Sequence, residues 1–275
     1  MQRHYGTRRI SRSYLTLPKW VDLMVDKLED AFAQTALLLF GKAISPMSKY
    51  SNWLGQRVPG GKNVKSCFGK GIAYLPDYGF FKKMPHDRLV SFEDLPIAAG
   101  KTIKMPQNGL SLANIAGQLN DFAYLVPTYA EGRNLNVQNT FGYIDCMNIR
   151  DSFDPFTSTN CSHSFSILDS EALFGVHRIV KSAFSIHVYN ALNVQRCFEI
   201  DGAKNCADSY FCHNVEDLSN CMFCFNTKAK RYAIGNAEVG KEKYLEFRKK
   251  FSDYWVKQLE SKGKLDFDIY NILGH

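Results

Sequence analysis

Four cysteines with metal-ligand potential lie close together in the second half of the chain: Cys206, Cys212, Cys221 and Cys224. The last two form a Cys-x-x-Cys pair, and four converging thiolates can hold a structural zinc ion. In a strand, however, residues three apart point to opposite faces, so a strand would not bring Cys221 and Cys224 together. We therefore interpret these cysteines as small, buried side chains. A zinc site formed by the four of them remains the alternative.

Two acid–histidine pairs occupy the same stretch, each separated by one repeat length. His187 precedes Glu199, and Asp201 precedes His213. A carboxylate beside an imidazole can perform acid–base chemistry, for example on a sugar. The same spacing also suits outward positions of a repeat, where polar residues simply face water. We favour the second interpretation. A carbohydrate-binding or carbohydrate-active protein that uses these pairs is the first alternative function.

Other chemical motifs are absent from the sequence. It contains no Gly-x-Ser-x-Gly, no His-Glu-x-x-His and no glycine-rich dinucleotide loop. We therefore expect a non-enzymatic protein with no catalytic residues, no cofactor and no metal.

A repeat between Lys181 and Lys228 sets the spacing of these residues. Small residues recur every twelve positions, each followed by a large apolar one: Ser185-Ile186, Cys197-Phe198, Ser209-Tyr210 and Cys221-Met222. Residue types that tolerate left-handed backbone recur with them: Asn190, Gly202, Asn214 and Asn226. Short apolar segments broken at fixed intervals predict a β-solenoid, whose coils must stack to bury their apolar face. An offset of 24 matches slightly better than 12, so we favour a coil of two similar halves.

The rest of the chain divides around this solenoid, which we expect to span residues 135–236, with a looped-out insertion near Asp154 and Pro155. Residues 1–17 form a basic arm and contain a weak candidate interaction site: Arg3, Arg8, Arg9 and Arg12. The apolar pattern of residues 18–43 predicts a helix that starts at Pro18 and ends near Gly41. Residues 44–134 indicate an irregular, β-rich region, with a helix at 110–119 capped by Ser111.

The C-terminal segment, residues 237–275, contains a second helical pattern from Lys241 to about Lys262. Its apolar face consists of Tyr244, Phe247, Phe251, Trp255 and Leu259. Open solenoid ends expose unpaired strand edges and apolar core. We therefore expect this helix to cap the C-terminal end of the solenoid and the N-terminal helix to cap or dock at the other end.

Composition limits the partners. The 34 Lys and Arg residues against 27 Asp and Glu give a net charge of +7, which is no nucleic-acid signature by itself. Nucleic acid is possible but not favoured, and a zinc-dependent nucleic-acid module is the third alternative. The most apolar run, Thr35–Phe40, is too short for a bilayer, so we expect no membrane partner. Eight cysteines without a signal-peptide pattern indicate reduced thiols and a cytoplasm-like compartment.

The repeat resembles an uncharacterised family of Cys- and Asn-rich proteins from candidate-phylum bacteria and large tailed phages. The match lies mainly in residues 181–246 and rests on Asn205, Cys206, Asp208, Ser209, Tyr210, Phe211, Asn220, Cys221, Phe223, Cys224, Arg231, Tyr232, Ile234, Asn236, Glu242 and Tyr244. Family members often carry an N-terminal zinc-ribbon-like Cys-x-x-Cys pair, which this chain lacks. The resemblance implies a solenoid and a viral setting but no activity.

Together these observations predict a mainly β protein: a β-solenoid, or parallel β-helix, with 12/24-residue repeats, an N-terminal helix and a C-terminal capping helix. The expected role is that of a structural or assembly protein, a component of a phage head, tail or baseplate. Its expected partners are other structural subunits, present in many symmetric copies.

Overall fold

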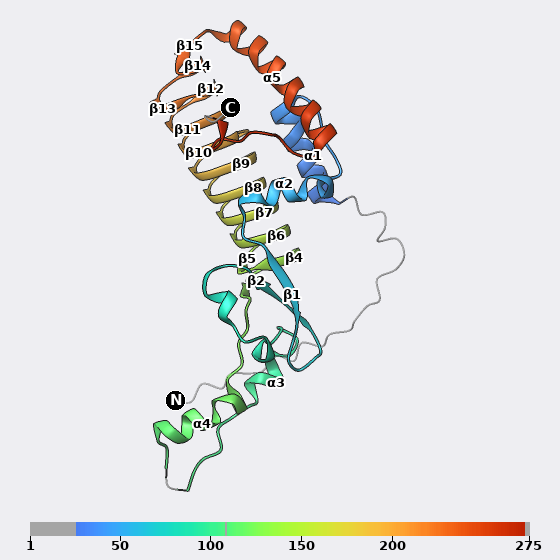
Figure 1. Ribbon diagram of the computed structural model, residues 1–275, viewed down its shortest axis with the longest axis vertical. Coiled ribbons are helices and arrows are strands. Elements are labelled where there is room, and N and C mark those ends of the chain that lie inside the picture. Colours follow the sequence, from blue (N-terminus) through green and yellow to red (C-terminus); the bar gives the residue numbers. More distant parts are fainter. Residues whose placement is uncertain (1–25, 108, 273–275) are drawn as a thin grey trace, which may run out of the picture.

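The predicted solenoid dominates the computed structural model, which describes residues 26–107 and 109–272 (Figure 1). Parallel strands stack into about nine turns, with helices before and after them in the chain. The fold class predicted from the sequence is therefore confirmed. The basic arm, including Arg3, Arg8, Arg9 and Arg12, lies outside the described residues.

Helix α1 (Lys27–Phe40) follows the N-cap residue Asp26, which accepts a hydrogen bond from the Leu28 backbone N–H at 3.1 Å. Gly41, with a φ of 74°, ends the helix where the sequence predicted. The predicted start at Pro18 lies outside the described residues. The buried face of α1 consists of Leu28, Ala31, Phe32, Thr35, Ala36, Leu39 and Phe40.

Residues 44–129 are irregular, as predicted, but contain less strand than expected. One antiparallel pair, β1 (Gly61–Lys65) and β2 (Ile72–Pro76), accompanies several short helices. The helices are η2 (Met47–Tyr50), α2 (Ser51–Leu54), η3 (Gly55–Arg57), η4 (Gly79–Lys83), η5 (His86–Arg88), α3 (Leu95–Ala99) and α4 (Leu112–Phe122). The predicted cap of α4 is confirmed, because the Ser111 hydroxyl accepts a hydrogen bond from the Asn114 N–H.

The strands of the solenoid keep one register throughout. Ile149 pairs with Cys161, Phe174 with Ile186, and Phe198 with Tyr210. The coil is therefore twelve residues long, and the favoured 24-residue coil was wrong. The strands are β3 (Ala130–Glu131), β4 (Leu135–Phe141), β5 (Tyr143–Ile144), β6 (Met147–Phe156), β7 (Thr159–Leu168), β8 (Glu171–Val180), β9 (Ala183–Leu192), β10 (Phe198–Lys204), β11 (Tyr210–Glu216), β12 (Ser219–Met222), β13 (Phe225–Lys228), β14 (Arg231–Ile234) and β15 (Ala237–Glu238).

The insertion predicted near Asp154 and Pro155 was also wrong. Strand β6 runs through both residues, and Pro155 pairs with Ile167 in the common register. Asp and Pro favour turns, which is why they suggested a loop. In this solenoid a turn-like conformation is part of the regular coil, so these residues fit without an insertion.

The coil is built from units of three residues. Every third residue from Asn136 to Gly235 has a positive φ, between 44° and 68°. A twelve-residue coil thus contains four such corners. The left-handed conformation costs about 1–2 kcal/mol for most residues but less for Asn, Asp and Gly, which explains the abundance of Asn and Asp in the repeat.

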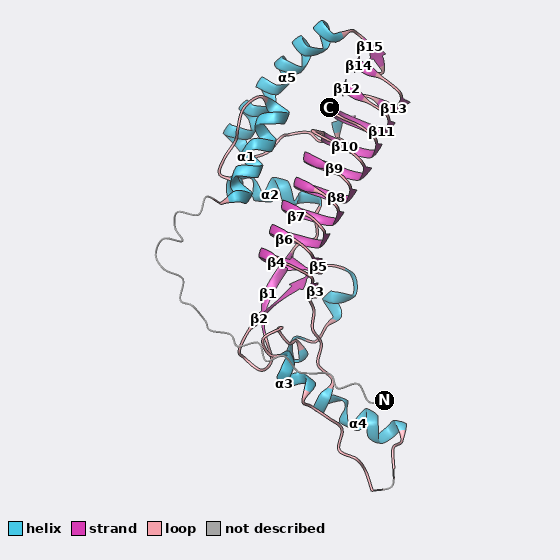
Figure 2. Ribbon diagram, turned by 180° about the vertical axis from the view of Figure 1, so that it is seen from behind, coloured by secondary structure: helices cyan, strands magenta, loops and turns pink. Residues whose placement is uncertain are grey.

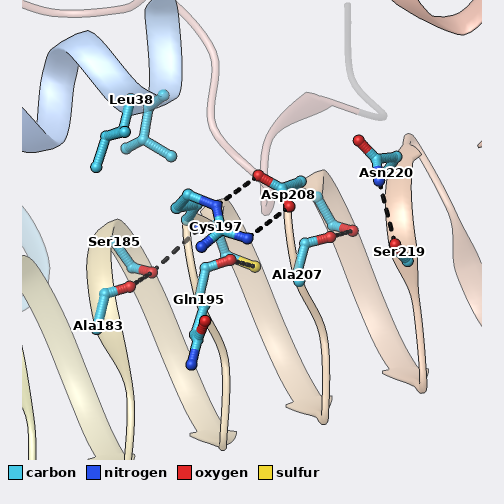
Figure 3. Close-up of polar contacts among 12 residues, drawn as sticks. Leu38, Ala183, Ser185, Gln195, Cys197, Ala207, Asp208, Ser219 and Asn220 are labelled. Carbon is cyan, nitrogen blue, oxygen red and sulfur yellow. Dashed lines mark hydrogen bonds and ion pairs between the residues drawn. The ribbon is translucent and has the colours of Figure 1, made fainter.

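The interior receives one side chain from each unit of three. Apolar members include Ile149, Leu173, Val188, Ile200 and Val215, and most other interior positions hold Ser or Cys. These hydroxyls and thiols make the same contact, donating to the carbonyl two residues earlier. Figure 3 shows Ser185 bonded to the Ala183 carbonyl at 2.9 Å and Cys197 to the Gln195 carbonyl at 3.4 Å. Ser and Cys therefore alternate because both are small donors that fit a narrow interior.

Helices α1, α2 and α5 (Lys241–Lys262) cover one side of the solenoid, which we call the helical flank (Figure 2). Beneath them lies an outward column of large side chains: Phe174, Ile186, Phe198, Tyr210 and Met222. The Trp255 ring of α5 lies 5.7 Å from the Phe198 ring and 5.2 Å from the Phe211 ring. The predicted bounds of α5 are confirmed.

The prediction that the N-terminal helix caps or docks at the other end of the solenoid was wrong, and the C-terminal helix covers more than the end that it was expected to cap. Helix α5 starts beside the last coil and runs back along the flank (Figure 1), while α1 packs on β6 to β9 rather than on the first coil. At the C-terminal end, β14 pairs with the short antiparallel strand β15. This pairing covers the edge that a further coil would otherwise need.

Candidate functional site

The four cysteines of the zinc alternative lie inside the solenoid: Cys206, Cys212, Cys221 and Cys224. Each thiol contacts the backbone carbonyl two residues earlier, at 3.3 to 3.6 Å. Burial raises the pKa of the Cys206 thiol and holds that of Cys212 well above its ordinary value, which disfavours the thiolate that zinc requires. Hydrogen bonds from the Cys212 and Cys221 thiols instead lower the pKa of Cys224. The expectation that Cys221 and Cys224 point to opposite faces was wrong, because the three-residue unit turns both inward. Across residues 26–107 and 109–272, no three His, Cys, Asp or Glu side chains are arranged to hold a metal ion. The geometry therefore favours packed side chains.

His187 and Glu199 form a stacked pair, as predicted, but they do not face water. The His187 Nδ1 atom lies 2.6 Å from the Glu199 Oε1 atom, and both side chains are fully buried. His187 Nε2 lies 3.1 Å from the Trp53 carbonyl oxygen. The second Glu199 oxygen accepts a hydrogen bond from the Ile269 N–H at 3.0 Å. The outward-facing interpretation of this pair was wrong, because helices cover the column on which it lies.

This pair joins three distant parts of the chain. Trp53 belongs to α2, the pair itself to β9 and β10, and Ile269 to the segment after α5. Gly175 makes room for the contact, since a Cβ atom there would lie 2.4 Å from the His187 ring and 2.8 Å from the Leu54 carbonyl oxygen. A buried pair that loses one partner leaves an uncompensated polar group. The arrangement therefore fastens the helical flank and the C-terminal segment to the solenoid.

Asp201 and His213 are brought together at the border of the helical flank. The His213 Nδ1 atom lies 3.0 Å from the Asp201 Oδ2 atom, and the two side chains are 44% and 12% exposed. Asp201 also accepts a hydrogen bond from the Asn190 side-chain amide at 2.8 Å. This carboxylate–imidazole pair is open to solvent on the histidine side. Of the two predicted pairs, it alone could contact a ligand.

A shallow groove of about 540 Å³ lies beside this pair and runs along the coils. One wall carries amides and the other charged side chains; the main members are Asn190, Asn214, Asn226, Lys204, Glu216 and Lys228. Ala203, Val215 and Thr227 also line it. Lys204 and Glu216 form an ion pair at 2.8 Å across neighbouring coils. The groove is polar, and its lining side chains recur from coil to coil at the strand spacing.

The residues that surround the two pairs were missed by the sequence analysis. Arg57 forms an ion pair with Asp268, and its guanidinium lies 4.2 Å from the Tyr270 ring centroid. Burial raises the pKa of Tyr189, which packs beside Arg57, well above its ordinary range. The alternation of Leu265, Phe267 and Ile269 could have indicated a packed extended segment. Nothing local could have shown which column it covers.

A third stacked pair, Arg196 and Asp208, lies at another border of the flank. Its two hydrogen bonds measure 2.7 and 2.8 Å, the bidentate geometry typical of a strong guanidinium–carboxylate contact. The Tyr244 hydroxyl of α5 donates to the Asp208 backbone carbonyl at 3.0 Å. Helix α5 is thus attached to the coil that carries this pair.

Comparison with known proteins gives no match to a family model or to a curated protein. Among the described residues, no helix is long and apolar enough to cross a membrane. The candidate interaction residues Arg3, Arg8, Arg9 and Arg12 lie in the part of the chain that the structure does not describe.

Proposed function

We propose that this chain is a non-enzymatic structural or assembly protein, whose solenoid presents a rigid surface to neighbouring subunits. The virion of a phage is the setting that the sequence resemblance favours, with the protein in a head, tail or baseplate. The proposal rests chiefly on how the potentially reactive residues are used. His187, Glu199 and the interior thiols are all committed to internal contacts.

The regularity of the solenoid supports a scaffold. Its register is constant from β4 to β14, and interior hydroxyls and thiols bond to the backbone at regular intervals. Outside, amides bond from coil to coil: Asn136 to Asn148, Asn148 to Asn160, Asn193 to Asn205, and Asn205 to Asp217. Each coil contacts only its neighbours, so these ladders stiffen the rod along its length. A stiff rod with flat exposed sides is suited to holding partners at fixed distances.

The experiment that tests this function is quantitative mass spectrometry of native particles from the source. Particles would be purified on a density gradient, washed with increasing salt, and assayed for zinc in the same fractions. We expect the chain to stay with the particle in a fixed ratio to its major protein, without stoichiometric zinc. A chain found only in the fractions at the top of the gradient would overturn the proposal, as would release at low salt.

One observation favours a second candidate, a carbohydrate-binding solenoid. The Asp201–His213 pair is open to solvent and borders the groove, whose amides could bond to hydroxyl groups spaced like the coils. This candidate no longer includes His187 and Glu199, because both are buried. Titration calorimetry with soluble oligosaccharides would test it. Binding that is lost in Asp201→Asn but kept in Asp217→Asn, a change at an exposed corner outside the groove lining, would favour this candidate over the scaffold.

A further inference from the structure

An apolar stripe runs along the solenoid half a coil away from the helical flank. It consists of the last residues of the four ten-residue strands: Phe156, Leu168, Val180 and Leu192. The pairing of β6 to β9 places these residues in one column. Six residues separate Phe174 of the flank from Val180, half of a twelve-residue coil. The stripe therefore lies on the opposite side from α1, α2 and α5.

The stripe is exposed, and its residues take no part in the hydrophobic cores of the described chain. Leu168 and Leu192 are 39% and 40% exposed, and the other two are half-buried. None of the four belongs to the hydrophobic clusters formed by residues 26–107 and 109–272. A contiguous apolar column on an otherwise polar surface is typical of an interaction site.

The corner residues that follow the stripe carry a pattern of charge. They are Thr157, Asp169, Lys181 and Asn193, all exposed. In the described part of the chain, neither Asp169 nor Lys181 forms an ion pair. The middle two corners thus offer one negative and one positive charge, one coil apart. On the other side of the stripe, Arg178 lies one coil from Ser166.

The charges and the length of the stripe together select one arrangement of two identical stripes. In a parallel pair related by a two-fold axis along the rod, the corner columns on the two sides of the stripe face each other, so Lys181 of each copy would meet Arg178 of the other, a like charge. An antiparallel pair with its two-fold axis at Leu168 or at Val180 would still oppose two Asp169 or two Lys181 side chains. Like charges placed directly opposite are destabilising. An axis midway between Leu168 and Val180 avoids these contacts, and among the antiparallel axes it alone places all four stripe residues opposite one another.

With that axis, the two surfaces are complementary throughout. Leu168 of one copy faces Val180 of the other, and Phe156 faces Leu192. Asp169 faces Lys181 twice, because a two-fold interface repeats each contact. Arg178 faces Ser166, and Asp154 faces Asn190. The apolar column is thus covered over its full length, which at a strand spacing of about 4.8 Å amounts to roughly 15 Å.

We propose that a second copy of this chain docks on the stripe, forming an antiparallel dimer about this axis. The inference rests on the proposed assembly function and names its copy-to-copy surface. The partner is a second copy because the stripe and its charges complement themselves.

The test is sedimentation equilibrium of the purified full chain over a range of concentrations. We expect a monomer–dimer equilibrium that Leu168→Asp shifts to monomer, while Leu112→Asp, at an 85% exposed position on α4, leaves it unchanged. Asp169→Lys should weaken dimerisation about tenfold or more, because it puts two lysine pairs in contact. Adding Lys181→Asp should restore it. Both residue types already occupy left-handed corners, so circular dichroism should show all variants folded.

Three results would overturn the proposal: a wild-type chain that stays monomeric, a dimer indifferent to Leu168→Asp, or a charge swap that fails to restore dimerisation. A monomeric chain whose stripe cross-links to a different protein in native particles would likewise reject the second copy as occupant. Such a result would leave the assembly function intact, whereas loss of the chain from native particles would reject that function regardless of the dimer.

Discussion

The solenoid interior and the helical flank are two hydrophobic cores built on opposite faces of the same strands. The interior receives small residues, such as Ser185, Val188 and Cys197, and none of its fully buried members is aromatic. The flank receives Phe174, Phe198 and Tyr210 from the coils and Trp255 from α5. In the interior the twelve-residue coil limits the size of a side chain. On the flank, helices adapt their distance to whatever the coils present.

The largest expected effect comes from removing the indole of Trp255, which lies at the centre of the helical flank. Trp255 is fully buried between coils and α1, so Trp255→Ala should lower the free energy of unfolding by about 3–5 kcal/mol. Urea denaturation would measure this loss. Tyr254→Ala on the same helix, 46% exposed, is the matched control and should change little. Equal losses in the two variants would show that α5 does not pack as described.

The size limit of the interior can be tested by enlarging one residue. Ile200 is fully buried between Val188 and Cys212 of the neighbouring coils. We expect Ile200→Phe to cost about 1–3 kcal/mol by overpacking, and Ile200→Leu, which conserves volume, to cost less than about 1.5 kcal/mol. Chemical denaturation of both variants gives the comparison. A phenylalanine tolerated as well as leucine would mean that the interior is not size-limited.

The left-handed conformation of the corners can be tested with two substitutions that differ only in backbone freedom. Asn205 has a φ of 54° and bonds to Asn193 and Asp217 on either side. Both Asn205→Ala and Asn205→Gly remove these bonds, but only alanine pays for the left-handed conformation. Asn205→Ala should therefore be less stable than Asn205→Gly by about 1 kcal/mol. Thermal denaturation would detect the difference, and the reverse order would refute the three-residue unit.

The last prediction concerns a half-buried acid at another corner. Burial raises the pKa of Asp154 to about 6, above the value of 3.8 expected in the unfolded chain. The folded state therefore binds more protons between these values, and stability falls as the pH rises from about 4 to 6. Asp154→Asn removes the titration and should flatten this part of the pH profile. Its stability relative to wild type should be greater at pH 8 than at pH 4, as melting temperatures would show.

The solenoid could be predicted from sequence because its register is local and repeats. Ser185, Cys197, Ser209 and Cys221 are aligned by counting alone, and their strands pair as counted. The three-residue unit was missed because only the left-handed corners reveal it, and many hold residues that rarely adopt this conformation, such as Phe184 and Arg178. The burial of His187 and Glu199 could not be predicted either. It depends on α2 and on residues near Ile269, whose contacts with β9 and β10 have no periodic signal.

The constant register makes the length of the rod adjustable in whole coils. Removing twelve consecutive residues from coils that no helix covers would shorten the rod by one strand spacing, about 4.8 Å, while every column stays aligned. A deletion whose length is not a multiple of twelve would shift the columns out of line. Under α1 and α5 the same deletion would also shift the helices against the columns that they cover. Duplication of a coil can therefore lengthen the rod at the first coils. The number of coils that carry the helices is fixed.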